Sequence, residues 1–227
     1  FRVEDSFSFF HLLAFAIGTF CISAGSLSLN QIQEVENDKK MKRTEDRPLV
    51  TGRFSMKFAL SLSLGLIIFG EVILFYVSPL SSLIGLIIII LYNGFYTLHW
   101  KRKWPFAAVP GAIPGALPGV LGISAVSDRI FSPESVYLFL VMFLWQMPHF
   151  WSLAIKYADD YRSGGFPVLP SVLGASRAKY HISFYVWSYA LLAIMSPFFV
   201  DYAHAYFLLV LPFALLVVGL FVKYFNS

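Results

Sequence analysis

The sequence contains few charged residues and almost no cysteine. Asp, Glu, Lys and Arg make up 13% of its 227 residues, well below the roughly 25% that is typical of soluble proteins. The single cysteine, Cys21, excludes an intrachain disulfide and a cysteine-rich metal site. We also find no short apolar segment with a small-residue cleavage site after it, and therefore expect no signal peptide.

A continuous basic surface is missing as well, although the formal charge is +4 and the pI is near 9.1. The 17 Lys and Arg residues lie between long apolar runs and not along one soluble face. We therefore expect no nucleic-acid partner.

Long apolar runs dominate the chain, of which 58% is hydrophobic. About 20 helical residues cross the roughly 30 Å hydrocarbon core of a bilayer. We predict an all-α, polytopic transmembrane bundle in which residues 1–227 form one domain. Its seven expected spans are residues 9–29, 56–77, 81–98, 105–126, 134–155, 181–200 and 203–221.

Lys and Arg are unevenly divided between the connections of these spans. The first, third and fifth connections hold seven, three and four of them and the C-terminal segment holds one, whereas the other side holds Arg2 and Arg129. Because cytoplasmic loops carry the excess of Lys and Arg, we expect the rich connections to face the cytoplasm. The chain would be a multi-pass protein of a bacterial inner membrane or an equivalent membrane.

The most polar stretch, residues 30–48, follows the first apolar run. Asn30, Glu34 and Asp38 recur every four residues, so on a helix they drift by only about 40° per step and form one stripe of oxygens. Mg²⁺ prefers oxygen ligands and commonly bridges one or two carboxylates to substrate phosphates. Arg43 and Arg47 follow one or two turns later and could bind phosphate oxygens. The stretch predicts a diphosphate site, with an ordinary solvated loop as the alternative.

A second polar group lies near the end of the fifth expected span. On a continuous helix one face would carry His149, Lys156 and Asp160. Lys156 is seven and Asp160 eleven residues after His149, and both offsets bring the side chain to within about 20° of the direction of His149 about the helix axis. His149 would lie roughly 10 Å deeper than Lys156, and an ionisable residue inside a span is a functional candidate. The alternative is a histidine that hydrogen-bonds between helices. Asp160 would face the first stripe across a cavity that opens to the cytoplasm.

Tyr92, Tyr96, Lys101 and Arg102 form a third group, at the same end of the bundle. The two tyrosines are one turn apart and could present π faces to a cation. Lys101 and Arg102 are either membrane anchors or further phosphate ligands.

The fourth expected span contains a Pro-Gly repeat, with prolines at positions 110, 114 and 118. These prolines should bend the helix and free carbonyl groups, which hydrocarbon tolerates only beside protein or a cavity. The helix is therefore either tightly packed or the wall of an intramembrane cavity for a long or flat apolar ligand.

Together these motifs resemble the UbiA-type intramembrane prenyltransferases, and within them the branch that farnesylates protohaem IX. Asn30, Glu34 and Asp38 match the first motif of the superfamily. The branch is matched by MKRTEDRPL at 41–49, YT at 96–97 with KR at 101–102, GALP at 115–118, and PHFW at 148–151 with DDYR at 159–162. Where the family has a second pair of acidic residues, this chain has Lys156 and Asp160, so a second full Mg²⁺ site is not expected. The family usually has nine helices, and the resemblance implies that the first and last are lacking here.

The resemblance implies Mg²⁺-dependent transfer of farnesyl from farnesyl diphosphate to a vinyl group of haem B, with addition of water, to give haem O. It implies Asn30, Glu34 and Asp38 as metal ligands and Asp160 as a supporting acid. Substrate-binding residues would be Arg43, Arg47, Tyr96, Lys101, Arg102, His149 and Lys156. The imidazole of His149, facing the cavity, would either bind the haem iron or assist the addition of water.

Two other functions stay open. Another UbiA-type enzyme would prenylate an aromatic or quinone precursor and would not need His149 as a haem ligand. A transporter or haem-delivery protein would have its site near mid-bilayer on broken helices, whereas this stripe lies at a helix end. Besides the lipid bilayer, haem-handling or oxidase-assembly proteins are the partners that the preferred function suggests.

Overall fold

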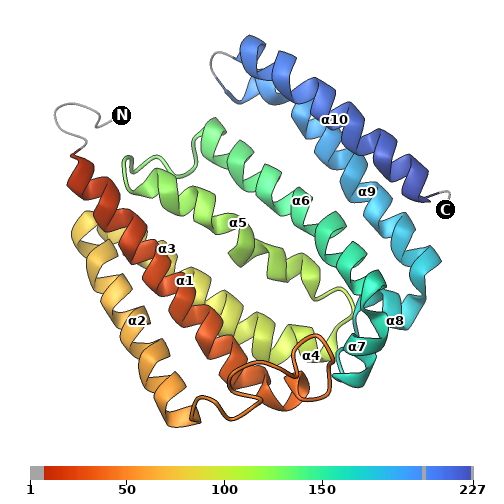
Figure 1. Cartoon of the computed structure of the whole chain (residues 1–227). Coiled ribbons are helices and arrows are strands. Elements are labelled where there is room, and N and C mark those ends of the chain that lie inside the picture. The colour runs from red at the N-terminus through yellow and green to blue at the C-terminus, as the bar shows by residue number, and fades with distance from the viewer. Residues whose placement is uncertain (1–7, 201–202, 226–227) are drawn as a thin grey trace.

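Figure 1 shows the computed structural model, in which the long helices lie side by side with similar axis directions. The structure describes residues 8–200 and 203–225, and Arg2 lies outside this part. The long elements are α1 (Phe9–Asp38), α2 (Met56–Val77), α3 (Pro79–Ile89), α5 (Ala108–Ser124), α6 (Pro133–Lys156), α9 (Ala175–Ile194) and α10 (Ala203–Phe225). The π-helix η1 (Ile90–Trp100) and α4 (Lys101–Lys103) continue α3 without interruption. The short helices are α7 (Ala158–Ser163), α8 (Leu169–Leu173) and the 3₁₀ turn η2 (Ser196–Phe198).

The all-α prediction is confirmed for the described residues, and each of the seven expected spans falls mainly on a helix. By length and apolar composition, four of the described helices could cross a membrane: α1, α2, α6 and the continuous helix from α3 to α4. The helix α5 and the described apolar part of α10 are shorter. The helix α9 does not meet the same criterion, because Arg177, Lys179 and His181 make its first turns polar.

Two helices extend well beyond their expected ends. The helix α1 ends at Asp38 and not at residue 29, so Asn30, Glu34 and Asp38 lie on one continuous helix. The third span continues through η1 and α4 to Lys103, and therefore carries Lys101 on a helix as well. Polar residues thus extend both helices past their apolar parts at the same end of the bundle.

The helices α1 and α2 approach each other closely because glycines lie between them. A Cβ atom added to Gly70 of α2 would lie 2.8 Å from the carbonyl oxygen of Gly18 and 2.9 Å from the backbone nitrogen of Ile22. The hydroxyl of Ser63 also donates to the carbonyl of Gly25 at 2.7 Å. Small residues that permit such contacts stabilise helix pairs in membranes.

We expect Gly70→Ala to destabilise the protein by about 1–3 kcal/mol, because backbone atoms of α1 would have to move. Gly65 lies on the same helix and faces open space, so Gly65→Ala should be neutral or slightly stabilising. Thermal unfolding of both variants in detergent measures the difference. Equal loss of stability in the two variants would contradict the close contact.

The core consists of two apolar clusters on either side of α5. One cluster joins α1, α2, α3 and α5 around Leu74 and Leu121, and the other joins α5, α6, α8 and α9 around Trp151 and Ile182. Many large apolar side chains remain exposed on the outer surface, including Phe20 at 71% and Phe184 at 67%. This outer surface fits contact with lipid.

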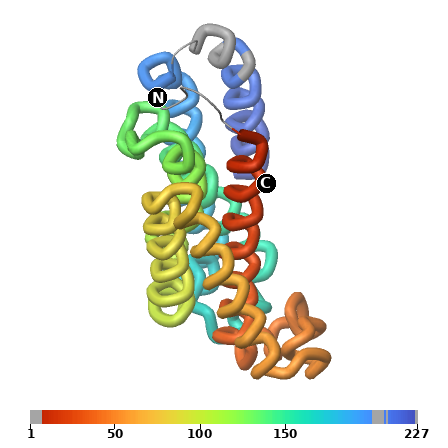
Figure 2. Tube along the Cα trace, turned by 90° about the vertical axis from the view of Figure 1, so that its left-hand side faces the viewer, coloured from red at the N-terminus to blue at the C-terminus, as the bar shows by residue number. Residues whose placement is uncertain are grey.

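The polar segments gather at one end of the bundle. The helices α4, α7 and α8 lie at the lower end in Figure 1. In Figure 2 the orange connection between α1 and α2 projects from the same end. The fold therefore brings the polar stretch after α1 to the same end of the bundle as α4 and α7, although α7 lies more than a hundred residues further along the chain.

Candidate active site

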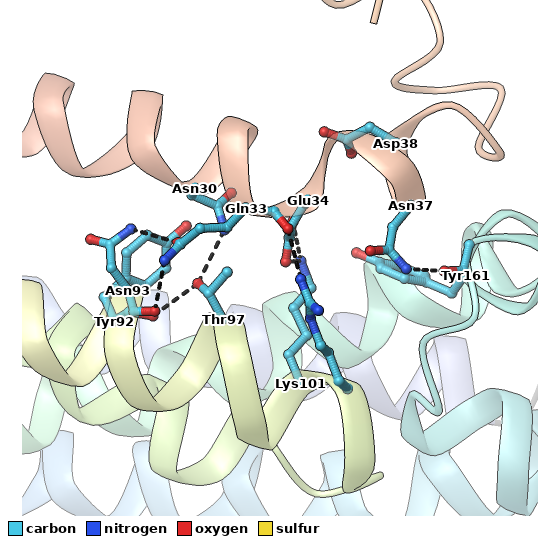
Figure 3. Close-up of polar contacts among 12 residues, drawn as sticks. Asn30, Gln33, Glu34, Asn37, Asp38, Tyr92, Asn93, Thr97, Lys101 and Tyr161 are labelled. Atoms are coloured by element: carbon cyan, nitrogen blue, oxygen red, sulfur yellow. Dashed lines mark hydrogen bonds and ion pairs between the residues drawn. The ribbon is translucent and has the colours of Figure 1, made fainter. Parts of the chain in front are cut away.

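A ladder of three polar pairs joins α1 to the helix formed by η1 and α4. Figure 3 shows two of them, Asn30 with Thr97 and Glu34 with Lys101. In each pair the two residues are 67 positions apart, so the helices run in the same direction. The contacts are Ser26 Oγ to Asn93 Oδ1 at 2.6 Å, Asn30 Nδ2 to Thr97 Oγ1 at 3.1 Å, and Lys101 Nζ to both carboxylate oxygens of Glu34 at 2.7 and 2.8 Å. The predicted stripe on α1 therefore faces a matching stripe on its neighbour.

Two of the three partners on the second helix, Asn93 and Thr97, lie in the π-helical segment η1. A π-helix forms i→i+5 hydrogen bonds and has more residues in each turn than an α-helix. The hydroxyl of Thr97 also donates to the carbonyl of Tyr92 at 2.8 Å and satisfies one acceptor of the wide turn.

Asp38, the last residue of α1, pairs with the loop that follows. Arg47 donates to Asp38 Oδ2 at 2.6 Å, and the Asp38 side chain is only 1% exposed. Thr44 donates its hydroxyl proton to the Asp38 backbone carbonyl at 2.9 Å, which holds the loop against the helix end. The other oxygen, Asp38 Oδ1, is buried and has no hydrogen-bond partner within the described part of the chain.

The same loop is tied to α7. Asn37 donates to the carbonyl of Gly164 at 2.7 Å, and the backbone N–H of Arg43 donates to Asp160 Oδ2 at 3.2 Å. The Arg43 guanidinium carbon lies 5.4 and 5.7 Å from the ring centroids of Tyr157 and Tyr161. Asp160 thus lies beside the loop that carries Arg43.

These residues surround a polar cavity of about 280 Å³. Seven of the predicted site residues line it: Asn30, Glu34, Asp38, Arg43, Arg47, Tyr96 and Lys101. Its remaining wall includes Tyr92, Tyr161, Trp104, Phe150 and Trp151. Carboxylates and cations therefore meet in one cavity whose wall includes several aromatic side chains.

A second cavity of about 250 Å³ adjoins the first and is lined mainly by apolar groups. Both cavities are lined by Tyr92, Tyr96, Ala108 and Phe150, so these residues mark the junction between them. Residues of the Pro-Gly repeat form one wall: Gly111, Pro114, Gly115 and Pro118. Of the two alternatives that the sequence left for this helix, the structure supports the cavity wall.

The predicted position of His149 is wrong. His149 is exposed, lines neither of these two cavities, and stacks on Trp145 with ring centroids 5.0 Å apart. The helix α6 instead buries Met147, Trp151 and Ala154, which lie on nearly the opposite side of the helix. The imidazole therefore does not face the cavity.

Three related predictions also need correction. Lys156 is exposed, and α6 ends there, so no continuous helix carries Lys156 and Asp160. Asp160 contacts the loop but does not line either cavity described above. Arg102 is exposed and donates to the backbone carbonyl of Gln33 at 2.6 Å, outside the lining of the polar cavity.

The sequence analysis missed Asn93, Thr97 and Gln146. Asn93 and Thr97 precede Lys101 at the same four-residue spacing as the stripe on α1, and this repeated spacing could have identified them. Gln146 is 5% exposed and lines the apolar cavity. Its amide nitrogen donates to the carbonyls of Ala112 and Met142 at 3.2 and 2.8 Å. No periodic signal marks it.

The sequence profile of the UbiA prenyltransferase family matches residues 1–227. The chain belongs to this family. The UbiA family and the four apolar helices together make it an integral membrane protein and an intramembrane prenyltransferase.

Several curated members of the family are similar over most of the chain. The protoheme IX farnesyltransferase of Bdellovibrio bacteriovorus is 45% identical over 227 residues, which cover the whole chain and 78% of that protein. Protoheme IX farnesyltransferase 1 of Lysinibacillus sphaericus is 39% identical over 80% of the chain and 58% of its own length. The protoheme IX farnesyltransferase of Bacillus mycoides is 36% identical over 82% of the chain and 59% of its own length.

Solved structures of UbiA homologues share the fold. The apo structure from Aeropyrum pernix K1 has a TM-score of 0.76 and 18% sequence identity, and covers 97% of this chain and 83% of its own. The homologue from Archaeoglobus fulgidus bound to DMAPP and Mg²⁺ has a TM-score of 0.66 and 16% identity, over 96% of this chain and 75% of its own.

The residues of the polar cavity fit an Mg²⁺ ion that a substrate helps to hold. Asp38 Oδ1 is a buried oxygen without a partner in the described chain, and Glu34 supplies further carboxylate oxygens one turn earlier. Among the described residues, His, Cys, Asp and Glu side chains do not gather in groups of three or more. A site with few carboxylates suits Mg²⁺, which usually takes its other ligands from phosphates and water.

Proposed function

We propose that this chain transfers a farnesyl group from farnesyl diphosphate to a vinyl group of protohaem IX (haem B), with addition of water, to give haem O. The observation that carries the proposal is the junction of a charged cavity with an apolar one at Tyr92 and Tyr96. A diphosphate ester with an isoprenoid chain has the same two parts. The 45% identity to a protoheme IX farnesyltransferase supports the choice of acceptor.

The polar cavity would bind the diphosphate. Asn30, Glu34 and Asp38 would hold Mg²⁺, which supplies positive charge next to the leaving group when it is bound. Arg43, Arg47 and Lys101 would donate hydrogen bonds to the diphosphate oxygens. Such fixed donors stabilise the negative charge that grows on the diphosphate as the bond to farnesyl breaks.

The apolar cavity would take the farnesyl chain and exclude water from the reacting carbon. The C1–O bond of farnesyl diphosphate breaks, its electron pair leaves with diphosphate, and the vinyl group forms the new C–C bond. Water then adds to the vinyl carbon next to the porphyrin ring and loses a proton. Tyr92 and Tyr96, whose rings stack with centroids 5.8 Å apart, would face the positive charge on farnesyl at the junction.

The test is to incubate membranes that contain the chain with farnesyl diphosphate, haem B and Mg²⁺, and to analyse the haems by mass spectrometry. We expect a hydroxyethylfarnesyl haem, and its loss when EDTA removes the metal. Prenylation of an added phenolic acid or quinone precursor, with no modified haem, would contradict the proposed acceptor. An absence of any prenylated product would contradict the proposed reaction.

We also infer that the polar cavity opens toward the cytoplasm. The first, third and fifth connections carry most of the Lys and Arg residues, cytoplasmic loops carry such an excess, and the cavity lies at their end of the bundle. In this proposal residues 1–227 act as one prenyltransferase domain.

The orientation is tested with a cysteine introduced in place of Lys42, which is exposed in the first connection. It should react with a membrane-impermeant maleimide only after the cells are opened, because the connection would face the cytoplasm. The native Cys21 is buried and should not interfere. Labelling of intact spheroplasts would reverse the assigned orientation. Interactions with proteins that deliver haem B or receive haem O are predicted from the proposed function alone.

A further inference from the structure

Both carboxylates of the polar cavity are paired with cations of the same chain. Lys101 Nζ contacts both oxygens of Glu34, at 2.7 and 2.8 Å, whereas Arg47 contacts one oxygen of Asp38, at 2.6 Å. The carboxylate side chains are only 3% and 1% exposed, and those of Lys101 and Arg47 are 19% and 31% exposed. Water therefore screens these pairs weakly.

The two pairs differ in how much of the carboxylate they leave accessible to a metal. Asp38 keeps Oδ1, which has no partner among the described residues. Both oxygens of Glu34 already contact the Lys101 ammonium. The ring of Phe166, 4.5 Å from Lys101 Nζ, further fixes the ammonium group in this position. A metal ion could therefore take Asp38 Oδ1 with Arg47 in place, whereas at Glu34 it would meet the positive charge of Lys101 unless that side chain moves.

Charge balance then decides when Lys101 can move. The four side chains Glu34, Asp38, Lys101 and Arg47 are neutral as a set. A divalent cation alone would add two positive charges to a buried, weakly screened site and would displace the ammonium without giving it a new partner. A diphosphate supplies the missing negative charge and new acceptors for Lys101.

We propose that Lys101 acts as a latch on Glu34, which makes a divalent metal and a diphosphate bind as a pair, each raising the affinity for the other. The inference rests on the proposed diphosphate site and is independent of the haem acceptor. Removing the Lys101 ammonium frees both oxygens of Glu34 for the metal but takes a hydrogen-bond donor away from the diphosphate, so the two ligands should be affected in opposite directions. Metal binding alone should become tighter, whereas diphosphate binding should become weaker.

The experiment uses the purified chain in detergent, with Mn²⁺ as the metal and inorganic pyrophosphate as the diphosphate. Free Mn²⁺ is measured by electron paramagnetic resonance, and bound pyrophosphate by radiolabel, with correction for their complex in solution. In the unmodified protein each ligand should raise the affinity for the other about tenfold or more, within the range of typical couplings. In Lys101→Met, Mn²⁺ alone should bind about tenfold more tightly and pyrophosphate about tenfold more weakly.

Lys103→Met is the matched control, since it removes one positive charge from an exposed residue of the same short helix. Both affinities should stay within about twofold in that variant, because a solvent-exposed charge is well screened. Weaker binding of both ligands in Lys101→Met, or unchanged Mn²⁺ affinity, would overturn the latch. If Lys101→Met does not fold, the test is whether Mn²⁺ and pyrophosphate raise each other's affinity in the unmodified protein. If they do not, the latch is rejected. These measurements need no haem, so they test the latch separately from the proposed function. If Mn²⁺ and pyrophosphate raise each other's affinity but no modified haem forms, only the proposed function is refuted. If haem is farnesylated but the two ligands do not affect each other's binding, only the latch is refuted.

Discussion

Replacing Glu34 by glutamine should lower the rate of haem farnesylation by about 10²–10³-fold, the usual cost of removing one fixed electrostatic group from an active site. Glutamine has nearly the same shape and keeps one oxygen that can accept a hydrogen bond from Lys101, while its NH2 group takes the place of the second oxygen; rates are therefore compared per amount of folded protein. It removes the negative charge that would hold Mg²⁺ beside the diphosphate. The measurement is the initial rate of hydroxyethylfarnesyl haem formation at saturating Mg²⁺.

Glu36→Gln provides the matched control for this prediction. Glu36 lies on the same helix, but its side chain is 75% exposed and pairs with Lys39 on the surface. Exposed pairs of this kind contribute little, so we expect activity within about twofold of the unmodified chain. A full rate in Glu34→Gln, or equal losses in the two variants, would reject the stripe on α1 as the metal and diphosphate site.

Gly115→Ala should lower kcat/KM for farnesylation by about ten- to a hundredfold, because it forces a group in the wall of the apolar cavity out of place, and small misplacements at a site can cost about a hundredfold. The added Cβ would overlap Gln146 Oε1, which occupies the space that Gly115 leaves beside the apolar cavity. The Gln146 amide cannot move freely, because its nitrogen donates to two backbone carbonyls. Binding of pyrophosphate in the polar cavity should be unaffected, which distinguishes local overpacking from loss of the fold.

Gly122→Ala tests the same change on the same helix, at a position that faces open space. We expect this variant to keep its activity, and the small gain in helix propensity should not lower its stability. Thermal unfolding and kcat/KM are measured for both variants. If Gly115→Ala matches Gly122→Ala in activity, the apolar cavity beside α5 does not bind a reacting group.

Local patterns in the sequence predicted the helices and the stripe that lines the polar cavity. Apolar runs of sufficient length form helices in a bilayer because every backbone group must be paired within the segment. The spacing of Asn30, Glu34 and Asp38 depends only on helix geometry, and the structure places all three along one cavity. The Pro-Gly repeat left two alternatives, a tightly packed helix or a cavity wall, because freed carbonyl groups need either protein or a cavity beside them, and the structure decided for the cavity.

The pairing of distant residues could not be predicted in the same way. The ladder joins α1 to Asn93 and Thr97 of η1 and to Lys101 of α4, which lie 67 residues further along the chain than their partners. The residues alone left Lys101 as a membrane anchor or a phosphate ligand, and neither alternative included the ion pair with Glu34 that the structure shows. That contact needs two helix ends to lie side by side, which no spacing within one segment specifies.

His149 shows most clearly what depends on tertiary structure. A membrane helix is apolar on the side that faces lipid as well as on the side that faces protein, so hydrophobic periodicity does not distinguish the two. The sequence by itself determined that His149 lies on a helix, and that Lys156 shares its side. Only packing against α5 and α9 decided that Trp151 faces inward and His149 outward, because close contact between helices selects the buried face.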